Sequence, residues 1–131
     1  MIVIDTSALA AIFLREPEAP KFYERIGRAN DRILPPSCLV EFVLLRRYGG
    51  DHRRWIGKLM DVQDLHVPAF SSVMADLAAD AAERYGRGSR HPARLNFGDC
   101  LSYAVAKHLK APLLFKGNDF THTDIESALP A

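Results

Sequence analysis

The stretch MIVIDTSALAAIF, residues 1–13, changes from a run of apolar β-formers to a helical pattern across a single carboxylate, Asp5. Residues 2–4 predict a short buried strand, and the apolar residues that follow Thr6 and Ser7 predict a helix. Asp, Thr and Ser are common at the start of helices, where their side-chain oxygens accept hydrogen bonds from backbone N–H groups. Helix capping is therefore a sufficient reason for Asp5 unless the rest of the chain supplies another.

The remainder of the chain repeats this alternation of strand and helix without a linker or an internal repeat. Strands are expected at 2–4, 32–34, 65–67 and 112–115, and helices at about 7–15, 18–28, 37–48, 51–62, 71–85 and 97–109. This alternation is typical of α/β proteins, in which helices cover a parallel sheet. Ligands bind such sheets at the carboxyl ends of the strands, and Asp5 follows such an end.

The length and composition indicate one soluble globular domain, residues 1–131. Lys and Arg number 17 against 16 Asp and Glu, so the net charge of +1 creates no overall field, and a nucleic-acid partner would require a local basic patch. Cys38 and Cys100 lie in apolar patterns without metal-ligand spacing, as reduced core thiols do. Because no export signal and no run of about 18 apolar residues is present, we expect a cytoplasmic protein without membrane contact.

A second carboxylate, Glu41, lies within the apolar segment that begins at Pro35. The length of this segment and its proline-serine start favour a helix. Because burying an unpaired carboxylate is costly, Glu41 requires a cation, a metal ion or hydrogen-bond donors. The alternative is that Glu41 reaches solvent at the rim of the helix or pairs with a basic residue such as Arg46.

Two further acids lie at similar boundaries. Asn96 is a candidate helix N-cap, and Asp99 follows it in the first helical turn, where an acid also complements the helix dipole. Asp119 follows the strand that ends at Phe115, in a turn whose composition is itself sufficient to explain an aspartate. Each position therefore has a purely structural explanation of its own.

The four acids are more informative together than separately. None of Asp5, Glu41, Asp99 and Asp119 has an obvious basic partner at helical spacing. Carboxylates that converge at one sheet edge repel and raise each other's pKa unless a divalent cation lies between them. Ligation by oxygen alone suits Mg²⁺ or Mn²⁺ rather than zinc, and such a cation activates water and neutralises charge on a phosphodiester.

The same segments resemble a known family. The motifs that carry the resemblance, in order along almost the whole chain, are VIDTSAL, the isolated acid in CLVEF, NFGDCLSYAVA and LLFKGNDF. They are similar to PIN domains, and specifically to VapC-type toxins of bacterial type II toxin–antitoxin modules. The resemblance implies a PIN-like three-layer α/β/α sandwich with a short central parallel sheet. It also implies an endoribonuclease that hydrolyses RNA with Mg²⁺ or Mn²⁺ and is blocked by a cognate antitoxin.

The resemblance further assigns roles to individual residues. It implies that Asp5 and Asp99 are the principal metal ligands, that Glu41 is the third acid, and that Thr6 or Ser7 provides a hydroxyl near the metal. It also leads us to expect a homodimer or a toxin–antitoxin hetero-oligomer.

One part of the chain departs from the family pattern. Many members carry Thr-x-Asp/Asn-x-x-Phe after the last core strand, and counting back from Phe120 puts the usual fourth acid on Gly117. Either Asp119 or Asn118 replaces that acid from a neighbouring position, or the site operates with three acids.

Substrate contacts are expected in ERYGRGSRHPARLNFGD, residues 83–99, whose Gly, Ser and Pro content predicts a loop. No acid separates Arg84 from Phe97, and the loop leads into the helix that carries Asp99. The candidate phosphate contacts are Arg84, Arg87, Arg90 and Arg94. Tyr85 or His91 is a candidate for stacking on an unpaired base. The alternative is a loop that is simply solvated.

Two other classes of protein fit parts of the pattern. A phospho-acceptor signalling domain also has acids at strand ends, and Lys116 would suit it, but the strands at 32–34 and 65–67 are followed by proline instead of an acceptor aspartate. A catalytically inactive PIN fold that binds RNA or protein would fit the departure at Gly117. Metal-dependent RNA cleavage separates the nuclease from both.

Overall fold

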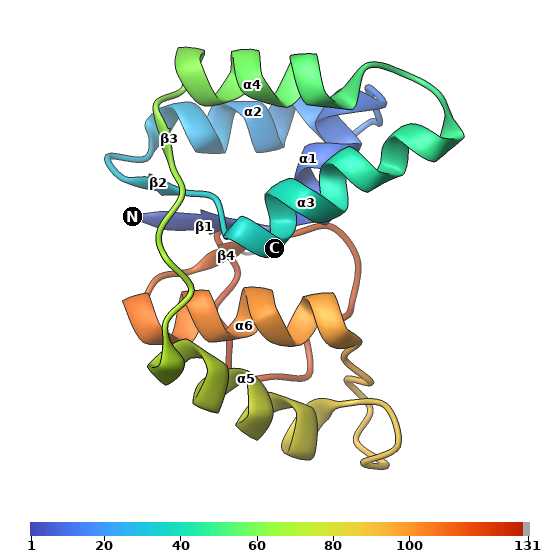
Figure 1. Cartoon of the computed structure of the whole chain (residues 1–131), viewed down its shortest axis with the longest axis vertical. Helices are drawn as coiled ribbons and strands as arrows, with labels where there is room; N and C mark the ends of the chain where they lie inside the picture. The colour runs from blue at the N-terminus through green and yellow to red at the C-terminus, as the bar shows by residue number, and fades with distance from the viewer. Residues whose placement is uncertain (130–131) are drawn as a thin grey trace.

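The computed structural model describes residues 1–129, which form a four-stranded parallel sheet with helices on both faces (Figure 1). The strands are β1 (Ile2–Ile4), β2 (Arg32–Ile33), β3 (Leu65–His66) and β4 (Leu113–Leu114). Their order is β3–β2–β1–β4, so the first strand of the chain lies inside the sheet. Because Asp5 directly follows β1, it lies between the carboxyl ends of two neighbouring strands.

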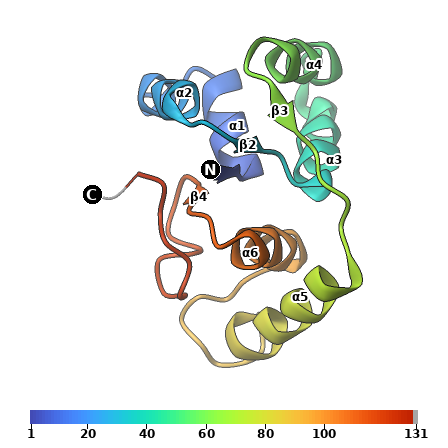
Figure 2. The same ribbon diagram turned by 90° about the vertical axis from the view of Figure 1, so that its left-hand side faces the viewer.

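The helices form two layers, one on each face of the sheet (Figures 1 and 2). The first layer contains α1 (Thr6–Phe13), α2 (Ala19–Arg28), α3 (Pro36–Leu44) and α4 (His52–Val62). The second contains α5 (Ser72–Tyr85) and α6 (Phe97–Leu109). Side chains alternate along β1, so that Ile2 and Ile4 pack in the core of the first layer and Val3 in that of the second. The predicted three-layer α/β/α sandwich is confirmed.

The largest difference from the expected boundaries lies in the helix predicted at 37–48. The α-helix ends at Leu44, and Leu45–Tyr48 continue as a 3₁₀ turn, η1. Gly49 and Gly50 follow with φ of 99° and 107°, a backbone region that favours glycine. The chain therefore tightens into a glycine turn instead of extending α3.

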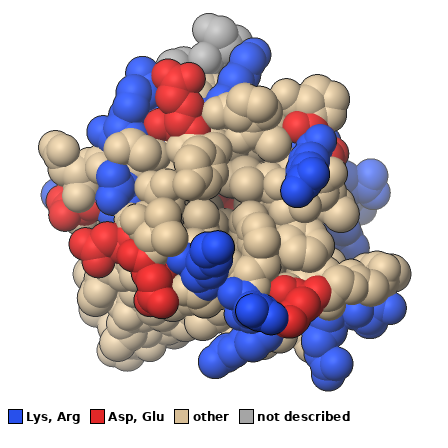
Figure 3. Space-filling view, turned by 90° about the horizontal axis from the view of Figure 1, so that it is seen from above, with Lys and Arg blue, Asp and Glu red and all other residues tan. Residues whose placement is uncertain are grey.

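The surface and the cysteines agree with the composition. On the face formed by α2 and α4, Lys and Arg are interspersed with Asp and Glu, and no single sign of charge dominates (Figure 3). Cys38 and Cys100 are buried and unpaired, as expected. Among residues 1–129, no helix combines the length and the apolar character that crossing a membrane requires.

Candidate active site

Asp5 is both the N-cap of α1 and a buried carboxylate at the carboxyl edge of the sheet. It is 6% exposed. Its Oδ2 accepts hydrogen bonds from the Ser7 backbone N–H at 3.0 Å and from the Ser7 hydroxyl at 2.6 Å. Its Oδ1 accepts from the Ser102 hydroxyl of α6 at 2.7 Å. Asp5 therefore does cap α1. A helix cap, however, requires neither burial nor a third hydrogen-bond donor from a distant helix, and Asp5 has both.

Ser7 connects Asp5 to the last strand of the sheet. While its hydroxyl donates to Asp5, the same oxygen accepts from the Lys116 backbone N–H at 3.0 Å. The Asp5 backbone N–H also donates to the Leu114 carbonyl at 2.9 Å. The orientation of the Asp5 carboxylate is consequently fixed by the chain that leaves β4.

The buried side chains of Ser102 and Cys38 contact the Asp5 carboxylate, and the sequence did not predict a role for either of them. Both are fully buried, and their Oγ and Sγ atoms lie 3.1 Å apart. Burial raises the pKa of the Cys38 thiol to about 12, which keeps it protonated and able to donate. The available signal was the place of Ser102 one helical turn after Asp99, on the same face of α6.

Glu41 is held at the same edge by α1 and α6. The Thr6 hydroxyl donates to its Oε1 at 2.9 Å. A methyl group at Gly98 would overlap the Glu41 carboxylate, so the absence of a side chain there lets the acid lie against the start of α6. Burial and the nearby Asp5 raise the pKa of Glu41, although the hydrogen bond from Thr6 acts against them. The alternative partner considered for Glu41, Arg46, forms no ion pair with it within residues 1–129.

Asp99 begins α6 as part of a capping box. Its backbone N–H donates to the Asn96 side chain at 2.8 Å, and its Oδ2 accepts from the Asn96 N–H at 3.1 Å. Burial raises the pKa of Asp99 to about 6, and the charges of Asp119, Asp5 and Glu41 contribute in that order. Asp99 therefore lies within electrostatic reach of each of the other three candidate acids.

Asp119 is exposed in the turn after β4, and Gly117 precedes it with φ of 96°. An acid at position 117 would have room, but it would have to adopt this left-handed backbone conformation, which side chains other than glycine rarely do. Asp119 is thus the residue of this turn whose charge reaches Asp99.

The donor set suits a divalent cation. Asp5, Glu41, Asp99 and Asp119 offer carboxylate oxygens, the ligands that Mg²⁺ and Mn²⁺ prefer. No ion pair within residues 1–129 includes any of them. In the same part of the chain no three Asp, Glu, His or Cys side chains form a ready-made cage. A cation bound among these acids would relieve the part of the Asp99 pKa shift that comes from the charges of Asp119, Asp5 and Glu41, the larger part being due to burial.

The arginine-rich segment divides into two parts. Arg84 and Tyr85 belong to α5, and the Arg84 guanidinium lies over the Tyr85 ring, 4.8 Å from its centre. The prediction that Tyr85 stacks on a base is wrong, because Tyr85 is 5% exposed and packs against His91 and Tyr103.

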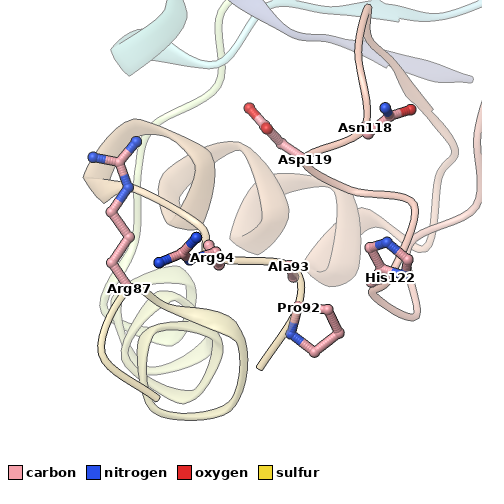
Figure 4. Close-up of a pocket in the computed structure, with 7 residues that line it drawn as sticks. All are labelled: Arg87, Pro92, Ala93, Arg94, Asn118, Asp119 and His122. Carbon is pink, nitrogen blue, oxygen red and sulfur yellow. The ribbon is translucent and has the colours of Figure 1, made fainter. Parts of the chain in front are cut away.

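The remaining arginines lie on loop 86–95. Arg87 and Arg94 line one cavity with Asp119 (Figure 4), while Arg90 is exposed but does not line it.

Lys116, considered above as the lysine of a signalling domain, is engaged elsewhere. Its Nζ pairs with Glu16 and Glu18 in the connection between α1 and α2, at 3.0 Å from the Glu18 carboxylate. The nearest link between Lys116 and Asp5 runs through its backbone N–H and Ser7. The geometry thus gives the lysine side chain a structural contact instead of a place beside an acceptor aspartate.

The fold and the acids define a class of protein, and comparison with known proteins identifies it. A family profile described as "PIN domain" matches residues 2–126. The chain belongs to the PIN-domain family, and its curated relatives in that family are VapC ribonucleases.

Three relatives illustrate the similarity. Ribonuclease VapC42 of Mycobacterium tuberculosis is 43% identical over 130 residues, covering 97% of this chain and 98% of the relative. Ribonuclease VapC28 of the same organism is 39% identical over 130 residues, covering 98% of each. Among solved structures, M. tuberculosis VapC20, described as a sarcin-ricin-loop-cleaving toxin, superposes with a TM-score of 0.75 over 99% of this chain and 100% of its own, at 18% identity. The last comparison supports the fold alone.

Proposed function

We propose that this protein is an Mg²⁺-dependent endoribonuclease, with Mn²⁺ able to substitute, and the toxin of a type II toxin–antitoxin module. The observation that carries the proposal is the acid cluster at the sheet edge, where Asp99 has its pKa raised to about 6 and no ion pair within residues 1–129 neutralises the acids. The ribonuclease names of relatives about 40% identical over the full chain point to the same activity.

Each acid has a distinct part in the proposed reaction. Asp5 and Asp99 would hold the cation, which would supply a Lewis acid to acidify water and to offset charge on the phosphodiester. The hydroxyl of Thr6 holds the Glu41 carboxylate in place through a hydrogen bond. The raised pKa of Glu41 suits this carboxylate to accept a proton from the attacking water. Ser7 keeps the Asp5 carboxylate oriented. The water oxygen bonds to phosphorus and the bond to the 3′ oxygen breaks. The departing 3′ oxygen takes a proton from solvent, which leaves 5′-phosphate and 3′-hydroxyl ends.

Asp119 completes the proposed site as the fourth acid. The Asp119 charge raises the pKa of Asp99, which supports a role for Asp119 beside the same cation. Asp119→Ala is expected to lower cleavage at least about tenfold, or about 1.4 kcal/mol, whereas Gly117→Asp is expected not to rescue it, because of the φ of 96° at that position. Wild-type kinetics for Asp119→Ala, measured on the same RNA, would leave a site of three acids.

RNA and a cognate antitoxin are the proposed partners of this single-domain chain, which we place in the cytoplasm as a homodimer or a toxin–antitoxin hetero-oligomer. The Arg84–Arg94 segment, with Arg87 and Arg94 beside Asp119, is the proposed contact to RNA backbone. Replacing Arg87 by Glu is expected to weaken RNA binding and to flatten its salt dependence by roughly 0.7 for each lost single-strand phosphate contact.

The activity is tested with purified protein and total RNA in Mg²⁺, in Mn²⁺ and in EDTA. We expect cleavage with either cation, none in EDTA, and at least a hundredfold loss in Asp99→Asn. Metal-independent cleavage, or full activity of Asp99→Asn, would refute the site. RNA binding without cleavage under every condition would favour the alternative of an inactive PIN-fold binding module.

A further inference from the structure

A cavity of about 510 Å³ opens beside the acid cluster, between loop 86–95 and the turn after β4. Its volume is in the range of roughly 300–1,000 Å³ that small-ligand sites occupy. The lining residues are Arg87, Pro92, Ala93, Arg94, Asn118, Asp119 and His122 (Figure 4). Asp119 is shared with the acid cluster, so a molecule in the cavity would lie next to the proposed cation.

The charge of the cavity favours an anion. Two guanidinium groups, Arg87 and Arg94, line it against one carboxylate, and no ion pair within residues 1–129 uses either arginine. Arginine binds phosphate through paired N–H groups with a fixed geometry. The cavity thus offers a phosphate site directly beside the acids.

The loop that carries these arginines is held rigidly at its base. The Arg87 N–H donates to the Leu95 carbonyl at 3.1 Å, and the Leu95 N–H donates to the Tyr85 carbonyl at 2.7 Å. Arg94 has a φ of 52° and lies between Ala93 and Leu95, which are 6% and 2% exposed. A non-glycine residue keeps such a conformation only when its surroundings enforce it, and this kind of strain is common at binding sites. The fold therefore fixes the backbone of Arg94, from which its exposed side chain reaches the cavity.

The far end of the cavity has different chemistry. In Figure 4, His122 and Pro92 lie toward one end and Arg87 toward the other, with Arg94 between them. The imidazole of His122 presents a flat surface, and histidine is one of the side chains on which unpaired RNA bases stack. The His122 ring and the Asn118 side-chain amide have no hydrogen-bond partner within residues 1–129. Their polar atoms are therefore available to the edge of a base.

We propose that this cavity is a nucleotide subsite beside the scissile phosphodiester, in which Arg87 and Arg94 bind a phosphate and His122 stacks on the base of the flanking nucleotide. The proposal rests on the nuclease function above. It implies that cleavage has a nucleotide preference at one position next to the cut, and that the preference depends on His122. Asn118, which also lines the cavity, hydrogen-bonds to the edge of that base.

The test uses short single-stranded RNAs that contain a mapped cleavage site. At each of the two nucleotides flanking the cut, the four bases and an abasic residue are compared by kcat/KM in Mn²⁺. We expect wild-type protein to lose roughly 5- to 150-fold at one of these positions when the base is removed, the range that stacking gives. His122→Ala is expected to cost as much on the intact RNA, and the two losses are expected not to add.

Two variants make the result specific. His122→Phe keeps a flat ring and is expected to keep the loss on base removal, although hydrogen-bonded selectivity between bases changes. His108→Ala removes an exposed histidine of α6 outside the cavity and is the matched control. Losses that add fully, or no dependence on His122 at either position, would overturn the subsite.

The experiment separates this failure from that of the nuclease itself. If wild-type protein cleaves none of the RNAs, the proposed function has failed. If it cleaves them all and His122→Ala changes only inhibition by the antitoxin, the cavity binds protein and the nucleotide subsite is refuted.

Discussion

Carboxylates occur in two contrasting settings in this molecule. At the periphery, Lys116 pairs with Glu16 and Glu18, and Lys107 pairs with Asp124 at 2.6 Å. At the sheet edge, Asp5 and Glu41 receive hydrogen bonds from hydroxyl and backbone N–H groups, while no ion pair within residues 1–129 reaches them. Lys107 and Lys116 thus neutralise acids that have no proposed chemistry.

The effect on the pKa has opposite signs in the two settings. The hydrogen bond from Lys116 lowers the pKa of Glu18. Burial instead raises the pKa of Asp99 and of Glu41. Ionised Glu18 therefore stabilises the fold, whereas ionisation of Asp99 and of Glu41 opposes folding. Substitutions at the acid site and in the peripheral ion pairs test this difference.

The largest effect is expected for Asp5→Asn. Every hydrogen bond described for this carboxylate is accepted by it, so the amide of an asparagine would face donors. We expect cleavage to fall at least a hundredfold and the free energy of unfolding to fall by about 1–3 kcal/mol. RNA cleavage assays measure the first effect, and urea denaturation measures the free energy of unfolding.

Asp51→Asn is the matched control for this prediction, because Asp51 only caps α4, accepting from the Arg54 N–H at 3.2 Å. Asparagine caps a helix about as well as aspartate, so the control should change neither quantity. Equal effects in the two variants would mean that Asp5 is a cap and nothing more.

Gly98→Ala is expected to have the next largest effect. The new methyl group would displace the Glu41 carboxylate and break its hydrogen bond with Thr6. Because a flexible side chain can move away, we expect a small change in melting temperature but about a tenfold or greater loss of cleavage. Gly57→Ala in α4 meets no atom within 4 Å and is expected to be neutral or slightly stabilising. Unimpaired cleavage by Gly98→Ala would remove Glu41 from the site.

Asp99→Asn is expected to stabilise the protein in EDTA. The pKa of about 6 in the folded state lies above the ordinary 3.8, so the folded protein binds the proton more tightly, and stability falls as the pH rises between these values. Asparagine retains a carbonyl for the Asn96 N–H. We expect a gain of about 1 kcal/mol above pH ~6, or about 3–5 °C, after allowance for partial exposure.

Thermal melts at pH ~7.5 and ~5 provide the measurement. The gain should shrink at the lower pH, and saturating Mn²⁺ should stabilise wild-type protein far more than the variant. A variant that melts below wild type at both pH values would show that the capping hydrogen bond outweighs the repulsion.

The smallest effect is expected at the periphery, for Asp124→Asn. Burial acts to raise the pKa of Asp124, but the hydrogen bonds from Lys107 and Tyr103 outweigh it and the pKa lies below its ordinary value. The contribution of ionised Asp124 to the free energy of unfolding is therefore present above pH ~4 and disappears as the pH falls through its pKa in the folded protein. For a half-exposed pair we expect a loss of about 0.5 kcal/mol near pH 7 that diminishes toward pH ~3, with exposed Asp80→Asn as the neutral control. A loss independent of pH would indicate packing instead of charge.

The sequence predicted the order of the elements well because each signal is local. The apolar strand before Asp5, the proline-serine start of α3 and the Asn96 cap all act within a few residues. The position of Asp5 at the inner carboxyl edge followed from the parallel topology.

The remaining features depend on contacts between distant segments. Ser102 is an ordinary small residue on an apolar helix face until the fold brings Asp5 against it. Tyr85 ends the helix predicted at 71–85 but also lies in the segment 83–99, whose Gly, Ser and Pro content predicts a loop. Its spacing from Met74, Ala78 and Ala81 instead continues the buried face of α5, a regularity that was present in the sequence.

The hydrogen bond from the Lys116 backbone to Ser7 has a consequence for the synthesis of the protein. The first acid of the chain is made at once, yet the contacts that orient it come from α6 and from the residue that follows the last strand. A nascent chain shorter than 116 residues contains Asp5 but lacks the Lys116 backbone N–H that, through Ser7, helps to orient the Asp5 carboxylate. The site of this protein is therefore assembled only when the chain is almost complete.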